Sequence, residues 1–334
     1  MRKLLFPFIV VFLFAACKKE NLSVTGNKIA KNELNLRVAE SNIAILEHKA
    51  LPSETDPNIH TSTLGNPTQY AYLPVKATLR KDKLFIFIPG TTATPGGYLK
   101  IAKAAAQQGY YSFGVAYSNL FPIEFYEGTN PNDNTVENIL DEYLEGIDVS
   151  PKVNISRANS FENRIIKMIL YLDANYPAEN WKRFLNANNE ICWDKLSVAG
   201  HSQGSDHAMY MSKARSVLRA GFFGGPGSFK LNNGQYPTFM QEPGVTPDEN
   251  LYGFNHTKDL VRQWADVRPT WEVLGLPGMP NSVDDRMVNG AHKLTTSLQS
   301  NDAHSAIVSD SATPNDANGN PLYEPVWDYM CFPR

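Results

Sequence analysis

Short apolar runs that alternate with helix-like segments constrain the fold of this 334-residue chain more than any other feature. The segment KLFIFIPG, residues 83–90, is apolar over most of its length and ends at Pro-Gly. Such a run is typical of a strand that is buried on both faces of a sheet. The segment 98–109 has helical spacing and many alanines, and the glycine at its end is suited to a helix C-cap. This part of the chain therefore predicts a strand followed by a helix.

The same alternation continues along the rest of the chain. We expect a helix over 160–177 with Ser160 as its N-cap, and a second helix from 203 to about 217. Further strands are expected at 110–117, 195–200, 220–225, 251–256 and 292–298. Strands that alternate with helices predict an α/β fold with a mostly parallel central sheet and helices on both of its faces.

We expect one domain, from 66 to 334, because the alternation is continuous and no internal repeat divides it. Two segments rich in Gly, Pro and Asn, 118–158 and 226–250, are predicted to be insertions above the carboxyl ends of the strands. Ligand sites in parallel sheets form at that edge. The aromatic side chains near the first insertion either line an acyl or aryl pocket or simply pack the insertion; they are Tyr117, Phe121, Phe125 and Tyr126.

The first residues look like a targeting signal and not like part of the fold. Arg2 and Lys3 precede an 11-residue run that is almost entirely apolar, residues 4–14, and Ala-Ala-Cys follows it. A basic start, a short apolar core and small residues before a cleavage point are typical of an export signal. The run is shorter than the about 20 residues that span a bilayer. A buried N-terminal helix or strand is the alternative interpretation.

A cysteine directly after Ala-Ala makes this signal similar to that of bacterial lipoproteins, although Phe14 replaces the usual leucine. The resemblance implies that 1–16 is a signal peptide and that lipid on Cys17 anchors the mature protein in a membrane. Residues 17–65 are then expected to form a polar tether. Lys18 follows the cysteine where an acidic residue would favour the inner membrane, so we expect the outer membrane, on its periplasmic or cell-surface side.

Two cysteines remain after lipidation of Cys17. Cys192 and Cys331 either form a disulfide in an oxidising compartment or are buried free thiols. The sequence does not decide between these alternatives, because a disulfide requires the two Cα atoms to lie close together.

The segment KLSVAGHSQGSDHAMYMSKA, residues 195–214, places a serine between two glycines. This Gly-x-Ser-x-Gly pattern lies where an expected strand meets an expected helix. The glycines remove side chains that would collide with the neighbouring elements, and the turn exposes the Ser202 hydroxyl at the positive end of the helix. The pattern alone would occur about 0.1 times by chance in a chain of this length, so its position carries the argument. Ser202 is the candidate nucleophile, and an ordinary helix N-cap is the alternative.

A serine nucleophile needs a base, and the base needs an acid that orients it. In this architecture the expected chain order is serine, acid, histidine. Asp259 follows the expected strand 251–256, and His304 follows the expected strand 292–298. A helix cap is the alternative role for Asp259, and an exposed loop position is the alternative for His304. The rival acids and the rival base are Asp266, Asp284, Asp285 and His292.

Three other histidines are less suited to act as the base. His201 lies beside the nucleophile and is expected to pack or to shape the pocket, and His207 is expected to be structural. His256 and Asp259 are three residues apart and could bind a metal, but no third ligand is near them in the sequence.

Residues 83–308 resemble the α/β-hydrolase superfamily, and the segments FIFIPGT, VAGHSQG, FNHTKDLV and DAHSAIV carry the resemblance. The chain is most similar to exported bacterial members. The resemblance implies that Ser202 is the nucleophile, Asp259 the acid and His304 the base.

The same resemblance implies an oxyanion hole made of two backbone amides. One is the amide of Gln203, the residue after the nucleophile. Pro89-Gly90 stands where the superfamily often has His-Gly, so the second donor is expected at Thr91, with Thr92 as the alternative.

The implied reaction is the cleavage of carboxylic esters through an acyl-enzyme, without a metal or an organic cofactor. The mixed, polar insertions favour a soluble or polymer-linked ester. A peptidase, thioesterase or acyltransferase on the same triad is an alternative, and so is a non-catalytic surface binding protein with this fold. The net charge of -3 gives no electrostatic basis for binding nucleic acid.

Overall fold

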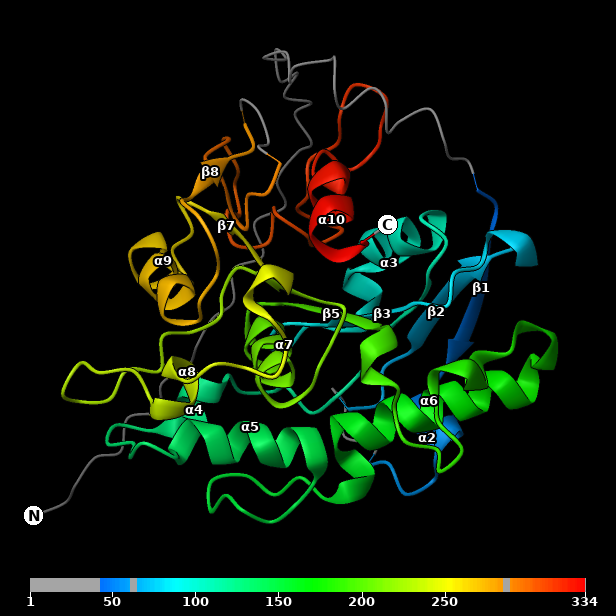
Figure 1. The fold of residues 1–334 in the computed structure, drawn as a ribbon, viewed down its shortest axis with the longest axis horizontal. Helices are drawn as coiled ribbons and strands as arrows, with labels where there is room; N and C mark the ends of the chain where they lie inside the picture. The colour runs from blue at the N-terminus through cyan, green and yellow to red at the C-terminus, as the bar shows by residue number, and fades with distance from the viewer. Residues whose placement is uncertain (1–42, 61–64, 285–288, 334) are drawn as a thin grey trace, which may run out of the picture.

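The computed structural model describes residues 43–60, 65–284 and 289–333. This part of the chain forms a nine-stranded sheet (Figure 1), whose strands are β1 (Ile45–Ala50), β2 (Gln69–Pro74), β3 (Leu84–Ile88), β4 (Tyr111–Gly114), β5 (Leu196–His201), β6 (Arg219–Phe223), β7 (Leu251–His256), β8 (Asn281–Ser282) and β9 (Lys293–Thr296). The strand order is β1-β2-β4-β3-β5-β6-β7-β9-β8. Only β2 runs against the other strands, since it is antiparallel to both β1 and β4 and the remaining pairs are parallel. The predicted α/β fold with a mostly parallel sheet is confirmed.

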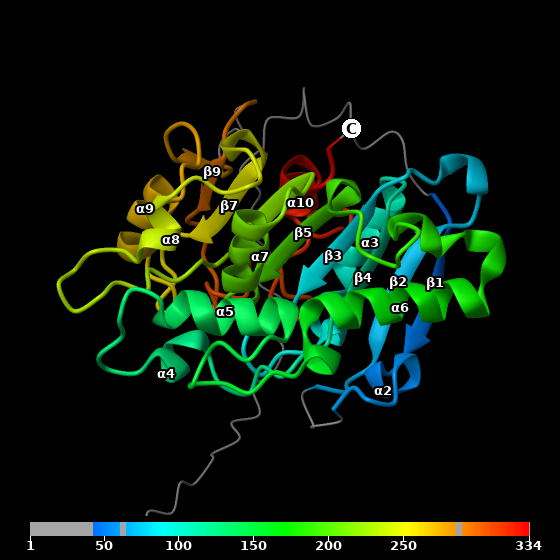
Figure 2. The same ribbon diagram turned by 60° about the horizontal axis from the view of Figure 1, so that its bottom comes forward.

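Nine α-helices of the described part cover or flank this sheet: α2 (Pro52–Thr55), α3 (Leu99–Gln107), α4 (Ile123–Glu127), α5 (Thr135–Glu145), α6 (Phe161–Asn175), α7 (Gln203–Ala214), α8 (Thr238–Gln241), α9 (Trp264–Val273) and α10 (Glu324–Cys331). Both views place α4 and α8 near one end of α5, beside the main body of the sheet (Figure 1, Figure 2). The Ser160 side chain accepts a hydrogen bond from the Asn163 amide at 3.3 Å, as expected of the N-cap of α6.

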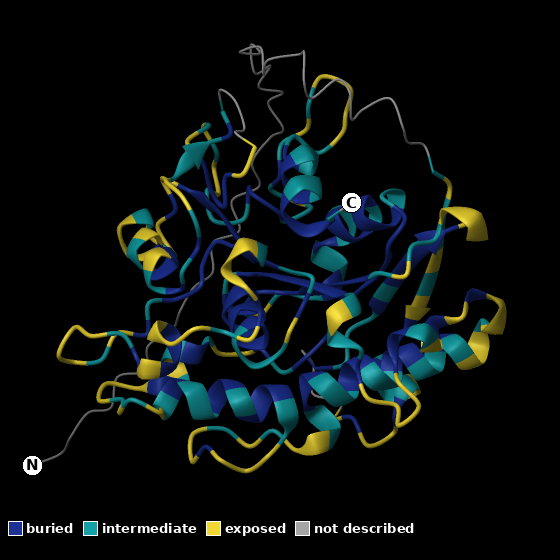
Figure 3. Ribbon diagram, viewed as in Figure 1, coloured by how far each residue is buried: buried dark blue, intermediate teal, exposed yellow. Residues whose placement is uncertain are grey.

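The central strands bury side chains on both faces, which explains why their sequences are continuous apolar runs. In β3, Ile86 lies in one hydrophobic core with residues of α5, α6 and α7. Its neighbour Phe87 lies in a second core with residues of α3 and α10. The central strands are accordingly dark blue in Figure 3, the colour of buried residues. The helices predicted on both faces of the sheet are therefore present.

The prediction of a polar tether over 17–65 is wrong for the described residues near its end. Residues 45–50 form β1, which pairs with β2 along its whole length. The His48 ring contacts the Glu179 carboxylate at 2.9 Å and stacks on Tyr176, so a polar side chain from this edge strand is fixed by a distant part of the chain. The domain therefore includes residues before 66.

The other predictions for the N-terminal region concern residues outside the described part of the chain. They are the signal peptide over 1–16, the lipid on Cys17 and the first part of the tether, up to residue 42. Within 43–60, 65–284 and 289–333, no helix is long and apolar enough to cross a bilayer.

Cys192 and Cys331 are free thiols, so the disulfide alternative is wrong. Cys331 is buried in the core that α3 and α10 share. The neighbours of Cys192, Ile191 and Trp193, pack against the core on the opposite face of the sheet. The sheet therefore separates the two thiols.

Candidate active site

The nucleophile candidate lies on a sharp turn between β5 and α7. Ser202 has φ 54° and ψ −122°, a backbone conformation that a non-glycine residue adopts only when its surroundings enforce it. The two flanking glycines allow this turn because neighbouring backbone atoms lie where a side chain would start at each position. A Cβ on Gly200 would lie 2.0 Å from the Gly204 carbonyl oxygen, and a Cβ on Gly204 would lie 2.0 Å from the Ile88 carbonyl oxygen. The structure therefore places the Ser202 turn where the sequence predicts it, between strand and helix.

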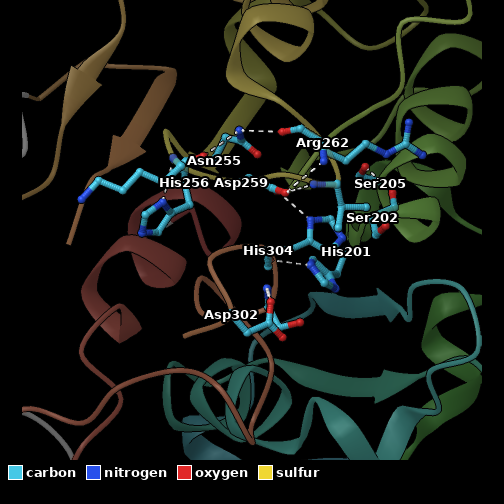
Figure 4. Close-up of polar contacts among 12 residues, drawn as sticks. His201, Ser202, Ser205, Asn255, His256, Asp259, Arg262, Asp302 and His304 are labelled. Carbon is cyan, nitrogen blue, oxygen red and sulfur yellow. Dashed lines mark hydrogen bonds and ion pairs between the residues drawn. The ribbon is translucent and has the colours of Figure 1, made fainter. Parts of the chain in front are cut away.

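Asp259 and His304 meet at the carboxyl edge of the sheet, although 45 residues separate them in the sequence. The His304 Nδ1 donates a hydrogen bond of 2.6 Å to Asp259 Oδ2 (Figure 4). The other carboxylate oxygen, Oδ1, accepts from the amides of Val261 and Arg262 at 2.7 and 2.9 Å. Burial alone would raise the pKa of Asp259, but the bond from His304 and the two amide bonds outweigh it and hold the pKa below its ordinary value. The carboxylate is thus kept in its charged form.

Ser202 and His304 pack against the same backbone segment, which follows β6. The Ser202 amide donates to the Phe223 carbonyl at 2.8 Å. The His304 ring lies against Gly224, where a Cβ would come within 3.1 Å of its Cε1 atom. Among the described residues, no partner holds the Ser202 hydroxyl by a hydrogen bond. Apo enzymes often show such an open contact between nucleophile and base, which closes when substrate binds.

His201 supports the loop that carries His304. Its Nε2 donates to the His304 carbonyl oxygen at 2.9 Å, and its Nδ1 accepts from the Tyr98 hydroxyl at 2.9 Å. The two histidine rings are 4.5 Å apart, centroid to centroid. Complete burial, together with the neighbouring His304, lowers the pKa of His201 to about 3, so its ring is neutral at physiological pH.

The backbone amides of Thr91 and Gln203 are among those at the site that form no hydrogen bond within the described part of the chain. The side chains of these residues are joined, because the Thr91 hydroxyl donates to Gln203 Oε1 at 2.8 Å. The alternative donor Thr92 is wrong, since its amide already donates to the Asn119 carbonyl at 2.9 Å. Asn119 also donates from its side chain to the Gly90 carbonyl at 2.6 Å, which fixes this loop. Thr91 and Gln203 therefore remain the amides that could bind an oxyanion.

The rival acids and base lie in other environments. Asp284 accepts hydrogen bonds from Thr296 and Ser297, and Asp266 lies in the first turn of α9. His292 precedes β9 and contacts the Leu251 carbonyl at 2.9 Å, so it lies at the amino edge of the sheet. Asp285 is outside the described residues.

His256, the proposed partner of Asp259 in a metal site, uses both ring nitrogens for backbone contacts. Its Nε2 donates to the Leu298 carbonyl at 2.7 Å, and its Nδ1 accepts from the Lys258 amide at 3.0 Å. Within the described ranges, no three His, Cys, Asp or Glu side chains are grouped so that they could hold a metal ion. His256 instead ties the turn after β7 to the segment after β9, and these two segments carry the acid and the histidine.

The four aromatic residues near the first insertion divide into two kinds. Tyr117 is buried and donates from its hydroxyl to the Pro89 carbonyl at 2.9 Å, so it packs the core. Phe121 and Phe125 are exposed and stack on each other with a centroid distance of 4.4 Å. Tyr126 is half-buried and meets both phenylalanine rings edge-on. The packing interpretation is therefore right for Tyr117 and does not account for the two phenylalanines.

The sequence analysis missed a cluster of charges around Arg262. Its guanidinium donates to Asp206 of α7 at 2.9 Å and also to Glu124 of α4. Asp206 is fully buried and accepts a further bond from the Gly227 amide at 2.8 Å. The signal available in the sequence was a pair of opposite charges near two site residues, an aspartate four residues after Ser202 and an arginine three residues after Asp259.

Neither models of known protein families nor curated protein sequences match this chain. The functional argument therefore depends on the geometry of the carboxyl edge.

Proposed function

We propose that this chain is a serine hydrolase of the α/β-hydrolase superfamily that cleaves carboxylic esters. The observation that carries the proposal is the 2.6 Å hydrogen bond between His304 and the buried Asp259, formed beside the strained Ser202 turn. The serine, the acid and the histidine follow three different strands at the carboxyl edge, in the chain order expected of this superfamily.

The topology of the sheet supports the same superfamily. The nucleophile turn follows β5 in the middle of the sheet, and the acid follows β7. The histidine follows β9, and only β2 is reversed. The order of the three residues along the chain is the one that the resemblance implies, although topology alone does not establish an activity.

In the proposed reaction, Ser202 attacks the ester carbonyl carbon while His304 Nε2 removes the hydroxyl proton. Asp259 keeps the proton of the neutral ring on Nδ1 and stabilises the positive charge that the ring gains. The amides of Thr91 and Gln203 donate to the oxygen that becomes negative, a contribution of about 3 kcal/mol per donor in comparable sites.

The tetrahedral intermediate then collapses to an acyl-enzyme on Ser202. His304 gives its proton to the leaving alcohol, and the C–O bond of the ester breaks. A water molecule attacks the acyl-enzyme with His304 again acting as base, which releases the carboxylic acid and restores Ser202.

A panel of p-nitrophenyl esters, thioesters and anilides tests this function with the full chain. We expect ester hydrolysis that falls by at least about 10⁴-fold in Ser202→Ala. The matched variant is Ser212→Ala, which removes a hydroxyl near the far end of α7, where it donates to the Met209 carbonyl, and should keep activity within about tenfold. Preference for anilides or thioesters would favour a peptidase or a thioesterase, and no turnover in the folded wild type would favour a binding protein.

Export and lipidation at Cys17 are part of this proposal. Cells that express the full chain and receive a radiolabelled fatty acid should incorporate the label into the wild type and not into Cys17→Ser. Equal incorporation into both proteins, or none into either, would contradict the proposed anchor.

A further inference from the structure

Several large apolar side chains are exposed at the carboxyl edge of the sheet, close to the proposed site. They come from two short segments, one around α4 and one directly after Asp259. We call them the apolar rim; its members are Leu120, Phe121, Phe125, Leu260 and Val261. The most exposed are Leu260 at 86 % and Val261 at 67 %. Single exposed apolar residues are ordinary, but a group of them marks a surface that binds something.

The first rim segment is attached to the oxyanion loop. Leu120 directly follows Asn119, whose carbonyl accepts the Thr92 amide and whose side chain donates to Gly90 and Ala93. The stacked rings of Phe121 and Phe125 come next along the chain. The loop that carries Thr91 and the segment that carries these rings are therefore tied together through Asn119.

The second rim segment is attached to the catalytic acid. Leu260 and Val261 are the next two residues after Asp259, and the Val261 amide donates to Asp259 Oδ1 at 2.7 Å. The backbone of this segment is thus fixed by the same carboxylate that orients His304. Its side chains are nevertheless among the most exposed apolar groups of the described residues.

Arg262 joins the two rim segments. It directly follows Val261, and it forms an ion pair with Glu124, the residue before Phe125. It also pairs with the buried Asp206 at 2.9 Å, and its own side chain is 11 % exposed. Buried ion pairs contribute little net stability, but they do fix geometry when every member is paired. Arg262 therefore links the two rim segments to each other and to Asp206, which lies in the helix that follows Ser202.

On the basis of the proposed function, we propose that the apolar rim binds the aliphatic acyl chain of the ester, so the enzyme prefers medium- and long-chain acyl esters. Continuity with the Thr91 loop and with Asp259 points to substrate as the occupant, because both rim segments are bonded to the residues that would hold the ester. This proposal replaces the expectation of a polar ester, which rested on the composition of the insertions. Composition alone does not describe the surface of the first insertion, since its Phe121 and Phe125 are exposed.

The test compares kcat/KM for p-nitrophenyl decanoate and p-nitrophenyl butyrate below the concentration at which micelles form. Wild type should prefer decanoate. The variants Leu260→Ser and Phe121→Ser/Phe125→Ser should each lower the decanoate-to-butyrate ratio by about tenfold or more, with butyrate hydrolysis little changed. These side chains are exposed, so their replacement should change stability little, and circular dichroism checks that each variant is folded.

A matched control replaces exposed apolar side chains of the same kind, a leucine and a valine, at the opposite edge of the sheet. Val75 and Leu79 are 44 % and 41 % exposed and follow the end of β2, which lies at the amino edge because β2 runs against its neighbours. The variant Leu79→Ser/Val75→Ser should keep the wild-type ratio. An equal fall of the ratio in this control would overturn the rim proposal.

The two proposals fail in different ways. Hydrolysis of butyrate with no preference for decanoate, or with a preference that the rim variants leave unchanged, overturns the rim proposal and keeps the hydrolase. Failure to cleave any ester overturns the proposed function itself. If the rim variants lose binding to phosphatidylcholine vesicles while the ratio stays constant, the rim is a membrane-docking surface and the acyl-chain proposal is wrong.

Discussion

Two histidines in contact, His201 and His304, occupy opposite electrostatic environments at the carboxyl edge of the sheet. The His304 ring faces the charged carboxylate of Asp259 at 2.6 Å. The two hydrogen-bond partners of the His201 ring are neutral, the Tyr98 hydroxyl and the His304 carbonyl. The difference teaches that a hydrogen-bonded carboxylate, and not burial or position beside the serine, distinguishes the proposed base from the histidine that supports its loop.

The neutral state of His201 also benefits its neighbour. The rings are 4.5 Å apart, so a positive His201 would oppose the charge that His304 would gain in the proposed reaction. Burial and His304 itself lower the pKa of His201 to about 3, which removes that opposition across the physiological range.

The largest effect should come from removing the charge that distinguishes the two histidines. Asp259→Asn leaves a side chain of the same size but takes away the negative partner of His304, so the wrong tautomer of the ring is favoured. We expect kcat for ester hydrolysis to fall by about 10⁴-fold while circular dichroism shows a folded protein. A loss of less than about tenfold would mean that another acid serves His304.

A smaller effect should follow from changing His201. Phenylalanine cannot donate to the His304 carbonyl, so the loop loses one of its supports, and we expect a fall of about 100-fold in kcat with little change in KM. Glutamine can still donate to that carbonyl and should retain activity within about tenfold of wild type. Equal losses in His201→Phe and His201→Gln would show that the ring packs the core without positioning His304.

The folded state should lose stability as the pH falls, because two buried histidines resist protonation. Burial lowers the pKa of His207 to about 3, and burial with His304 does the same for His201. Between about pH 6.5 and pH 3 the unfolded chain binds these protons and the folded chain does not, so stability rises with pH across that window. Each histidine contributes a slope of about 1 kcal/mol per pH unit.

Urea denaturation at several pH values checks this slope. His207 lies among the rings of Tyr117, Tyr143 and Phe161, so His207→Phe keeps an aromatic ring there and removes the titrating group. The variant should show a flatter pH dependence than the wild type. An unchanged slope would assign the acid sensitivity to other groups.

The smallest effect should come from Tyr98→Phe, which removes only the hydroxyl that donates to His201 Nδ1. The contact of His201 with the His304 carbonyl remains, so we expect less than a tenfold loss of activity and a loss of about 1 kcal/mol in the free energy of unfolding. A loss of activity as large as that of His201→Phe would mean that the tyrosine, and not the histidine, sets the position of the loop.

The sequence predicted those elements whose local residue pattern matches their burial in the structure. The apolar runs of β3 and β5 are buried on both faces, and the glycines around Ser202 are required by close backbone contacts, so both features are visible in the residues themselves. β1 was missed because ILEHKA has no continuous apolar run. Its His48 is held by Glu179, 131 residues away.

The candidate residues that depend on their order along the chain could be predicted from the sequence. Those that depend on contacts with distant segments could not. Ser202, Asp259 and His304 follow strands in a known order. The choice between Thr91 and Thr92 depends on a bond from Thr92 to the Asn119 carbonyl, which no local pattern shows. The role of Arg262 likewise depends on carboxylates 56 and 138 residues away.

Fluorophosphonate labelling of the full chain tests the central claim most directly. Peptide mapping by mass spectrometry should locate one adduct on Ser202, and the rate of labelling should fall sharply in His304→Ala and in Asp259→Asn. These variants retain the serine, so the fall would measure its activation by the histidine and the carboxylate. No adduct on the folded wild type, or an adduct that forms equally fast in all three proteins, would contradict the account.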